Sequence, residues 1–241
     1  MGALRNLKFR SADSACEMPA HFNAATAIRS RTMLLFSDSS SSQTVLDGEH
    51  GSVRYFPAAV PAARARDWFD QLRDVVPWGA FRRQMYDREV DVPRLVAVYD
   101  LDIAELPAAL GEARTVVQEL SAHVFNSVGL NRYRDGNDSV APHNDRLDDL
   151  IEGAPIALLS LGSTRRFVLQ TKTTPRRHLD LDLEPGSVLV MSYATQLHLN
   201  HGVPKTRERV GERISLAFRD RPRGDGQPRR RSAYYPADNA R

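Results

Sequence analysis

The sequence predicts an α+β domain: a jelly roll of β-strands with N-terminal helices packed on one side. Three observations lead to this prediction. Two amphipathic helical segments lie in the first half of the chain, about six short strand segments follow residue 126, and turn residues separate those strands at close spacing. Strands at this spacing are typical of sandwiches and barrels, and helices preceding them pack on one face. The 241 residues suffice for one such domain.

The two helical segments carry apolar residues at helical spacing. The first covers residues 61–76 and has a proline at its start, and the second covers residues 106–125. The apolar positions are Ala65, Trp68, Phe69, Leu72 and Val76 in the first segment and Leu110, Val116, Val117, Leu120 and Val124 in the second. Each helix is therefore expected to bury one face against the strands.

The predicted strands are short segments bounded by turn residues. They cover residues 126–133, 155–162, 165–171, 178–183, 187–192 and 213–219. Several of them alternate apolar and polar residues, which is the pattern of a strand with one buried face.

The two ends of the chain differ in composition from the middle. Residues 1–48 lack sustained periodicity and include the stretch SDSSSSQT, so we expect a disordered leader and linker. A transit peptide is the alternative, although Asp13 and Glu17 argue against it. Residues 220–241 contain six Arg and three Asp, so we expect a disordered basic tail, either solvated or in contact with phosphates. The domain would then cover residues 49–219.

Composition excludes several classes of protein. The single cysteine, Cys16, excludes an intramolecular disulfide and a cysteine-based zinc cluster, and it favours a cytoplasmic location. No apolar run approaches the roughly 20 residues that a membrane span needs, so no membrane partner is expected. The net charge of +3 allows a polyanionic partner but does not require one. We expect a monomer.

A histidine and an aspartate two residues apart, His143 and Asp145, form the first half of a candidate metal site. In an extended segment such residues point the same way, although an incidental loop histidine is the alternative. His201 follows the strand predicted at 187–192 and would lie at the rim of the same jelly roll. Two histidines and one carboxylate are the ligand set of non-haem Fe(II) oxygenases. His198 is the competing third ligand.

Two predicted strands supply polar side chains for a small anionic ligand. The last strand has an arginine at each end of one face, Arg213 and Arg219. Arginines suit a dianion because each guanidinium can grip a carboxylate by two hydrogen bonds, although two exposed charges on an edge strand are the alternative. Asn131 and Tyr133 share a face of an earlier strand and can donate hydrogen bonds to the same ligand, unless Tyr133 is only a core aromatic.

The motifs NRY, HND, HGVP and RxSxAxR together resemble the AlkB family of iron(II)- and 2-oxoglutarate-dependent dioxygenases, particularly its branch that repairs alkylated DNA. The resemblance covers about residues 53–219. It favours His201 over His198, because the family's third ligand stands in a His-x-x-Pro context. It implies a double-stranded β-helix fold and Fe(II) held by His143, Asp145 and His201. It also implies 2-oxoglutarate and dioxygen as cosubstrates.

The resemblance implies further roles around this centre. The positions that hold 2-oxoglutarate in the family correspond here to Asn131, Tyr133, Arg213 and Arg219. The stretch QMYDREVDVPR looks like the family's nucleotide-recognition lid. The expected contacts to the substrate are Tyr86 in this lid, Tyr99 as the stacking candidate after it, and Arg88 and Arg166 from the basic residues near the predicted mouth of the site.

The implied activity is oxidative demethylation of N-alkylated bases in nucleic acid, with DNA favoured over RNA. The enzyme would need to flip its target base out of a duplex. Two departures keep a second substrate class open. Arg146 and Leu147 replace the family's base-reading acids, with Asp148 and Asp149 following, and Tyr99 alone offers a ring after the lid. The alternative is the same oxidation of a protein, lipid or small molecule. A non-enzymatic binding module is the third possibility.

Overall fold

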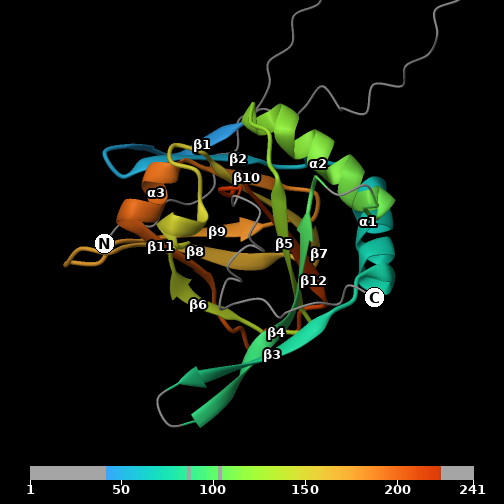
Figure 1. Cartoon of the computed structure of the whole chain (residues 1–241). Helices are drawn as coiled ribbons and strands as arrows, with labels where there is room; N and C mark the ends of the chain where they lie inside the picture. Colours follow the sequence, from blue (N-terminus) through green and yellow to red (C-terminus); the bar gives the residue numbers. More distant parts are fainter. Residues whose placement is uncertain (1–41, 86–87, 103–104, 224–241) are drawn as a thin grey trace, which may run out of the picture. The chain divides into compact units, whose positions relative to one another are not determined.

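Two antiparallel sheets build the fold in the computed structural model, which describes residues 42–85, 88–102 and 105–223 (Figure 1). Their strands are β1 (Gln43–Gly48), β2 (Gly51–Phe56), β3 (Gly79–Met85), β4 (Arg88–Asp100), β5 (Ser127–Tyr133), β6 (Val140–His143), β7 (Ile156–Gly162), β8 (Arg165–Thr171), β9 (His178–Leu183), β10 (Val188–Met191), β11 (Leu199–Val203) and β12 (Arg213–Arg219). The larger sheet has the order β1-β2-β10-β7-β12-β5-β4-β3, and the smaller has the order β6-β11-β8-β9. The jelly-roll prediction is confirmed.

All six predicted strands form, as β5, β7, β8, β9, β10 and β12. Four strands that the sequence pattern did not predict, β1 to β4, precede residue 126. The edge strand β1 shows why the pattern misses them. Its residues are exposed or half-buried, so it lacks the apolar alternation of a strand that buries one face.

The predicted domain boundaries at residues 48 and 219 were also wrong. Residues 43–48 form β1, which pairs with β2. At the other end Asn126 binds the chain beyond β12: its Nδ2 donates to Asp220 Oδ1 at 2.8 Å, and its Oδ1 accepts from Arg221 N at 3.0 Å. Residues 1–41 and 224–241 lie outside the described residues, so the leader and the tail stay predictions.

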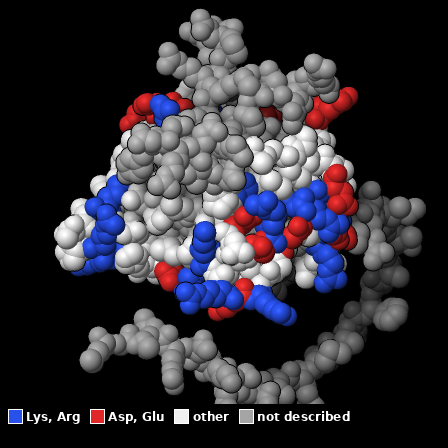
Figure 2. All heavy atoms as spheres, turned by 90° about the horizontal axis from the view of Figure 1, so that it is seen from below, with Lys and Arg blue, Asp and Glu red and all other residues white. Residues whose placement is uncertain are grey.

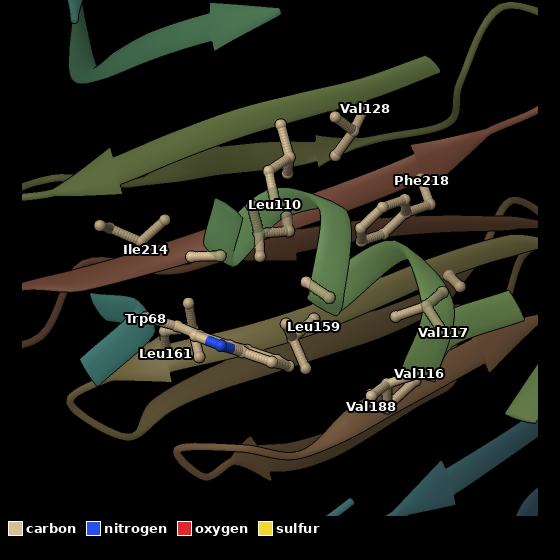
Figure 3. Close-up of a cluster of buried hydrophobic side chains, with 14 of the residues drawn as sticks. Trp68, Leu110, Val116, Val117, Val128, Leu159, Leu161, Val188, Ile214 and Phe218 are labelled. Atoms are coloured by element: carbon tan, nitrogen blue, oxygen red, sulfur yellow. The ribbon is translucent and has the colours of Figure 1, made fainter. Parts of the chain in front are cut away.

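Helices α1 (Ala62–Val75) and α2 (Ala108–Ser121) cover one face of the larger sheet, as predicted (Figure 1). Figure 3 shows the core beneath them, in which Trp68, Leu110, Val116 and Val117 meet Val128, Leu159, Leu161, Val188, Ile214 and Phe218. No helix among the described residues is long and apolar enough to cross a membrane.

Val124 does not belong to the buried face of α2, contrary to the prediction. The helix ends at Ser121, and Ala122 adopts the left-handed conformation with φ 53°. The chain therefore leaves the helical path before Val124, whose side chain is 67% exposed.

The central strands are buried on both faces, rather than on one as their alternation predicts. In β12, Ile214, Leu216 and Phe218 pack under the helices, because alternate side chains point to opposite faces. The other face of β12 is turned toward the smaller sheet, where Ala217 joins a second core. The polar residues of that face are thereby enclosed between the two sheets.

Candidate metal centre

Strand pairing brings His143 and His201 together. β6 and β11 are neighbours in the smaller sheet, and their register sets His201 directly opposite His143. The ring centroids are 4.6 Å apart. Asp145 follows β6 two residues later, and the ligand atoms of all three residues lie within 4.8 Å of one another. The predicted three residues therefore form a group that could hold one metal ion.

His198 is not part of this group. It ends the short helix α3 (Tyr193–His198), and its side chain is exposed. Its ring lies 5.3 Å from that of His50. Of the two histidines considered, the structure places only His201 beside His143 and Asp145.

Hydrogen bonds orient two of the three candidate ligands. His143 Nδ1 lies 3.0 Å from Ala141 O, so it carries the proton and leaves Nε2 as the ligand atom. The carboxylate of Asp145 accepts two bonds from Arg219, from Nε at 2.7 Å and from Nη2 at 3.0 Å. Such partners beyond the ligands fix the direction in which each ligand points.

The protonation states of the three residues suit a divalent cation. Burial lowers the pKa of His143 and lowers that of His201 to about 3, so both rings are neutral at pH 7. Burial alone would raise the pKa of Asp145, but the Arg219 guanidinium and the two imidazoles hold it well below its ordinary value. Two neutral imidazoles and one carboxylate need lose no proton to bind a metal.

A cavity of about 90 Å³ opens beside the three residues. It is lined by every residue predicted for the metal or for 2-oxoglutarate: Asn131, Tyr133, His143, Asp145, His201, Arg213 and Arg219. The face of β12 that carries both arginines is the face turned between the sheets.

The buried guanidinium of Arg213 makes an anion the expected ligand of this cavity. Arg213 is 1% exposed. Its Nε donates to Ser160 Oγ at 2.9 Å, and its guanidinium carbon lies 5.2 Å from the centre of the Tyr133 ring. Its Nη1 is buried and has no hydrogen-bond partner within the described part of the chain. A buried cation is costly unless it is paired. A carboxylate of 2-oxoglutarate fits this requirement.

Asn131 and Arg219 are both held by charged neighbours. Asn131 Oδ1 accepts a hydrogen bond from Arg94 Nε at 2.7 Å, which makes the amide nitrogen the donor that the prediction requires. Arg219 is already paired with Asp145. Its contact with 2-oxoglutarate stays a prediction.

The comparisons with known proteins agree with this geometry. The profile of a family described as the 2OG-Fe(II) oxygenase superfamily matches residues 94–219, just over half of the chain. The chain belongs to this superfamily. Fe(II), 2-oxoglutarate and dioxygen are thus its cofactor and cosubstrates, and the donors around the cavity fit them.

Named relatives of the oxygenase include DNA oxidative demethylase ALKBH2 from Bos taurus and from Homo sapiens. Each is 32% identical over 65% of this chain, which spans 64% of the bovine and 69% of the human protein. Alpha-ketoglutarate-dependent dioxygenase alkB homolog 3 from Mus musculus is 33% identical over 68% of this chain and 64% of its own length. The solved structure of OsALKBH1 shares the fold, with a TM-score of 0.54 and 14% identity over 75% of this chain and 100% of that one.

Two of the four predicted substrate contacts of the oxygenase lie away from the cavity. Tyr99 packs against the core beneath the helices, because it stands on the face of β4 opposite to Arg94. Arg166 points outward from β8 toward Asp180 at 3.8 Å, since its neighbour Phe167 points into the cavity. Neither residue lines the cavity, and a contact of either with substrate stays a prediction.

The remaining two predicted contacts fall in the stretch that resembles the family's lid. Tyr86 lies outside the described residues. Arg88 begins β4, and the placement of its side chain is likewise outside what the structure describes.

The cavity wall holds four charged residues that were not among the predicted contacts. Arg94, Arg146, Asp149 and Arg221 line it from four separate segments. Asp149 reaches the cavity because residues Leu147–Asp149 form a single 3₁₀ turn after the metal ligands. The sequence shows acids at positions 148 and 149, but it does not show the turn that places Asp149, and not Asp148, in the cavity wall.

Arg165 was missed as an organising residue. It is 3% exposed and donates to three carbonyl oxygens, those of Asp135 at 2.9 Å, Asp138 at 2.9 Å and Pro204 at 2.8 Å. These carbonyls belong to the segments that precede β6 and follow β11. Arg165 therefore ties together the ends of the two strands that carry the histidines.

Proposed function

We propose that this oxygenase oxidatively demethylates N-alkylated bases in nucleic acid, with DNA as the preferred substrate. One structural observation carries the proposal: the wall of the cavity that holds the candidate metal ligands carries, besides Arg213 and Arg219, three further arginines and one further acid. The names of the ALKBH2 relatives, which describe DNA oxidative demethylases, support the same substrate class.

Each group of residues has a task in this reaction. His143, Asp145 and His201 would hold Fe(II), and Arg213 would bind a carboxylate of 2-oxoglutarate. When bound, the metal and its cosubstrates supply the oxidation of a C–H bond. Hydroxylation of an N-methyl group yields a hydroxymethyl group, which leaves as formaldehyde. The chain itself binds and orients the reactants.

Asp149 provides the acid that Arg146 and Leu147 lack. Methylation at N1 of adenine or N3 of cytosine leaves the base positively charged at neutral pH. A carboxylate in the cavity wall complements such a cation, and it would disfavour an anionic substrate group at the same place. The replacement of the family's base-reading acids by Arg146 and Leu147 is the reason for considering another substrate class. A carboxylate at Asp149 weakens that reason.

The arginines of the cavity wall suit the phosphates on either side of a flipped base. Arg146 and Arg221 come from two separate segments, and guanidinium groups bind phosphates well, whereas Arg94 is buried and bonded to Asn131. On the face in Figure 2, most groups of basic atoms lie next to acidic ones. Because the described residues in Figure 2 form no extended basic patch on this face, we expect phosphate contacts to come mainly from the arginines of the cavity wall.

The test is formaldehyde release from oligonucleotides carrying 1-methyladenine or 3-methylcytosine, with Fe(II), 2-oxoglutarate and ascorbate. We expect release by the wild type and none by the variants His143→Ala and Asp145→Ala. Asp149→Asn should lower kcat/KM for these cationic bases about tenfold or more, because it removes a charge-assisted contact of about 1.5–3 kcal/mol. Arg73→Ala, on helix α1 and outside the cavity wall, is the control that should retain activity.

The outcomes separate the substrate classes. Succinate production without formaldehyde from any methylated oligonucleotide would contradict the nucleic-acid proposal and leave a protein, lipid or small molecule as substrate. Comparing DNA with RNA oligonucleotides tests the preference for DNA. A monomeric state and a cytoplasmic location, both predicted from the sequence, belong to the same proposal.

A further inference from the structure

Asp145 is a candidate ligand that no strand holds in place. β6 ends at His143, so the peptide of Asp145 lies outside the ladder that fixes the two histidines. We propose that Gln196 is the positioning residue that sets Asp145 as a metal ligand. This inference rests on the metal site of the proposed function.

The contact joins the backbone of Asp145 to a side chain 51 residues away. Asp145 N donates to Gln196 Oε1 at 3.0 Å, while the Asp145 carboxylate is held by Arg219. The bond to Gln196 fixes the peptide of Asp145, and the bonds from Arg219 fix its carboxylate. With both in place, the peptide and the carboxylate of Asp145 each have one defined direction, and the ligand set is preformed before a metal binds.

Gln196 is itself held firmly. It is 1% exposed, and its Nε2 donates to Thr195 Oγ1 at 3.0 Å, which in turn donates to Ser192 O at 2.7 Å. Lys172 Nζ binds Gln196 O at 2.7 Å. The amide therefore has its nitrogen and its oxygen assigned, and only the oxygen faces Asp145.

The β1–β2 turn, taken here with the first two residues of β2, Gly51 and Ser52, supports the helix that carries Gln196. Ser52 N donates to Ser192 Oγ at 2.9 Å, and Ser192 N donates to Ser52 O at 2.9 Å. Gly51, with φ 97°, lets the turn approach α3 closely: a Cβ there would lie 2.6 Å from Ser192 Oγ and 2.9 Å from Thr195 N. A path of direct contacts thus runs from this turn through α3 to the metal ligand.

The test is the affinity of the protein for Mn(II) and Co(II), measured by titration in the absence of substrate. Gln196→Met keeps the length and apolar volume of the side chain but removes the acceptor. We expect metal affinity to fall about tenfold or more, as for other residues that orient a ligand. The Co(II) absorption spectrum should change as well, because the carboxylate would be less constrained.

Gln170→Met is the matched control. Gln170 is also a buried glutamine, at 7% exposure, and lies on β8 in the same sheet as the histidines, but it does not line the cavity. We expect its metal affinity to equal that of the wild type. A merely structural role for Gln196 would lower the unfolding temperature of the metal-free protein and leave metal affinity unchanged, which would overturn the inference.

A second pair of variants tests the supporting turn. Gly51→Ala should weaken metal binding because its Cβ would displace Ser192 and Thr195, beside Gln196 in α3. Gly153→Ala also places a side chain at positive φ, 78°, but its Cβ would meet nothing within 4 Å, so it controls for backbone strain. Equal metal affinity in the two variants would contradict the path through α3. If the wild type itself bound neither metal, the proposed metal site would fail, which is a different result from failure of Gln196.

Discussion

Arg213 is the residue whose surroundings make the clearest demand for a ligand. Its guanidinium is buried between the sheets, and one nitrogen has no acceptor within the described part of the chain. Such an arrangement is unfavourable in the empty protein and favourable once a carboxylate is bound.

The substitution Arg213→Met should therefore change stability and binding in opposite directions. We expect the KM for 2-oxoglutarate to rise roughly 30-fold or more, since breaking a buried charged pair costs about 2–5 kcal/mol. Without 2-oxoglutarate, the free energy of unfolding should increase by about 1–4 kcal/mol, because a buried charge is replaced by an apolar side chain. Urea unfolding and succinate production measure the two effects. A variant that is less stable and binds 2-oxoglutarate normally would show that Arg213 is structural.

At this scale the sequence predicts ligands better than substrate contacts. His143, Asp145 and His201 could be predicted because their chemistry demands particular residue types at particular places on a strand. Tyr99 and Arg166 could not be placed, because both have the right chemistry and the wrong face of their strands. The face on which a residue lies depends on the register of its strand, and a shift of one residue moves its side chain to the opposite face.

At the scale of elements, the segment between β5 and β6 depends on Asp138. Its side chain is 4% exposed and accepts three bonds from Arg134, one from the backbone nitrogen and two from the guanidinium. Burial alone would raise the pKa of Asp138, but these bonds lower it below its ordinary value of 3.8. The ionised form is therefore the one that stabilises the fold.

Asp138→Asn should lower the free energy of unfolding at pH 7 by about 1.5–3 kcal/mol, because bonds to a charged acceptor are removed. A carboxyl with a lowered pKa stabilises above its unfolded-state pKa and loses that effect as the pH falls through its folded-state pKa. The difference between wild type and variant should accordingly shrink below pH 3.8. Urea titrations at a series of pH values measure it. A difference that stays constant down to about pH 2 would contradict the role of the ionised form.

Elements with strong patterns could be predicted from the sequence, and elements set by their neighbours could not. The central strands and both long helices carry apolar residues at the right period. β6 and β11 are short, and β11 reads LNHGV, in which the functional histidine and a glycine interrupt the pattern. The two strands that hold the candidate metal ligands were thus missed as strands while their histidines were identified. The alternation of apolar and polar residues is least regular in strands whose residues are required for function.

At the scale of the whole molecule, the end of the folded part bears on whether the proposed binding of nucleic acid belongs to the folded part or to the tail. Asp220 and Arg221 are bound to Asn126, and Arg223 pairs with Asp102 at 2.8 Å. A chain that ends at Arg223 keeps these hydrogen bonds and this ion pair. A chain that ends at Arg219 lacks them, together with an arginine of the cavity wall.

Removal of residues 224–241 should leave the unfolding temperature and the KM for 2-oxoglutarate unchanged. We expect DNA binding to persist, with its salt dependence set by the arginines of the folded part. The measurement is the slope of log K against log salt concentration, whose magnitude falls by about 0.9 for each DNA phosphate that the protein no longer neutralises. A slope that drops by several units on truncation would assign the phosphate binding to the tail.

The pairing of His201 with His143 across β6 and β11 has a consequence for folding. A slip of one residue between these strands would turn one imidazole to the opposite face of the sheet, since side chains alternate. Only the correct alignment can then coordinate an ion through both rings. A ligand that binds one conformation raises the population of that conformation by mass action. A bound metal would therefore favour chains in which β6 and β11 are paired in the correct register. The fraction of newly made chains that retain iron would report the fraction in which the smaller sheet has assembled correctly.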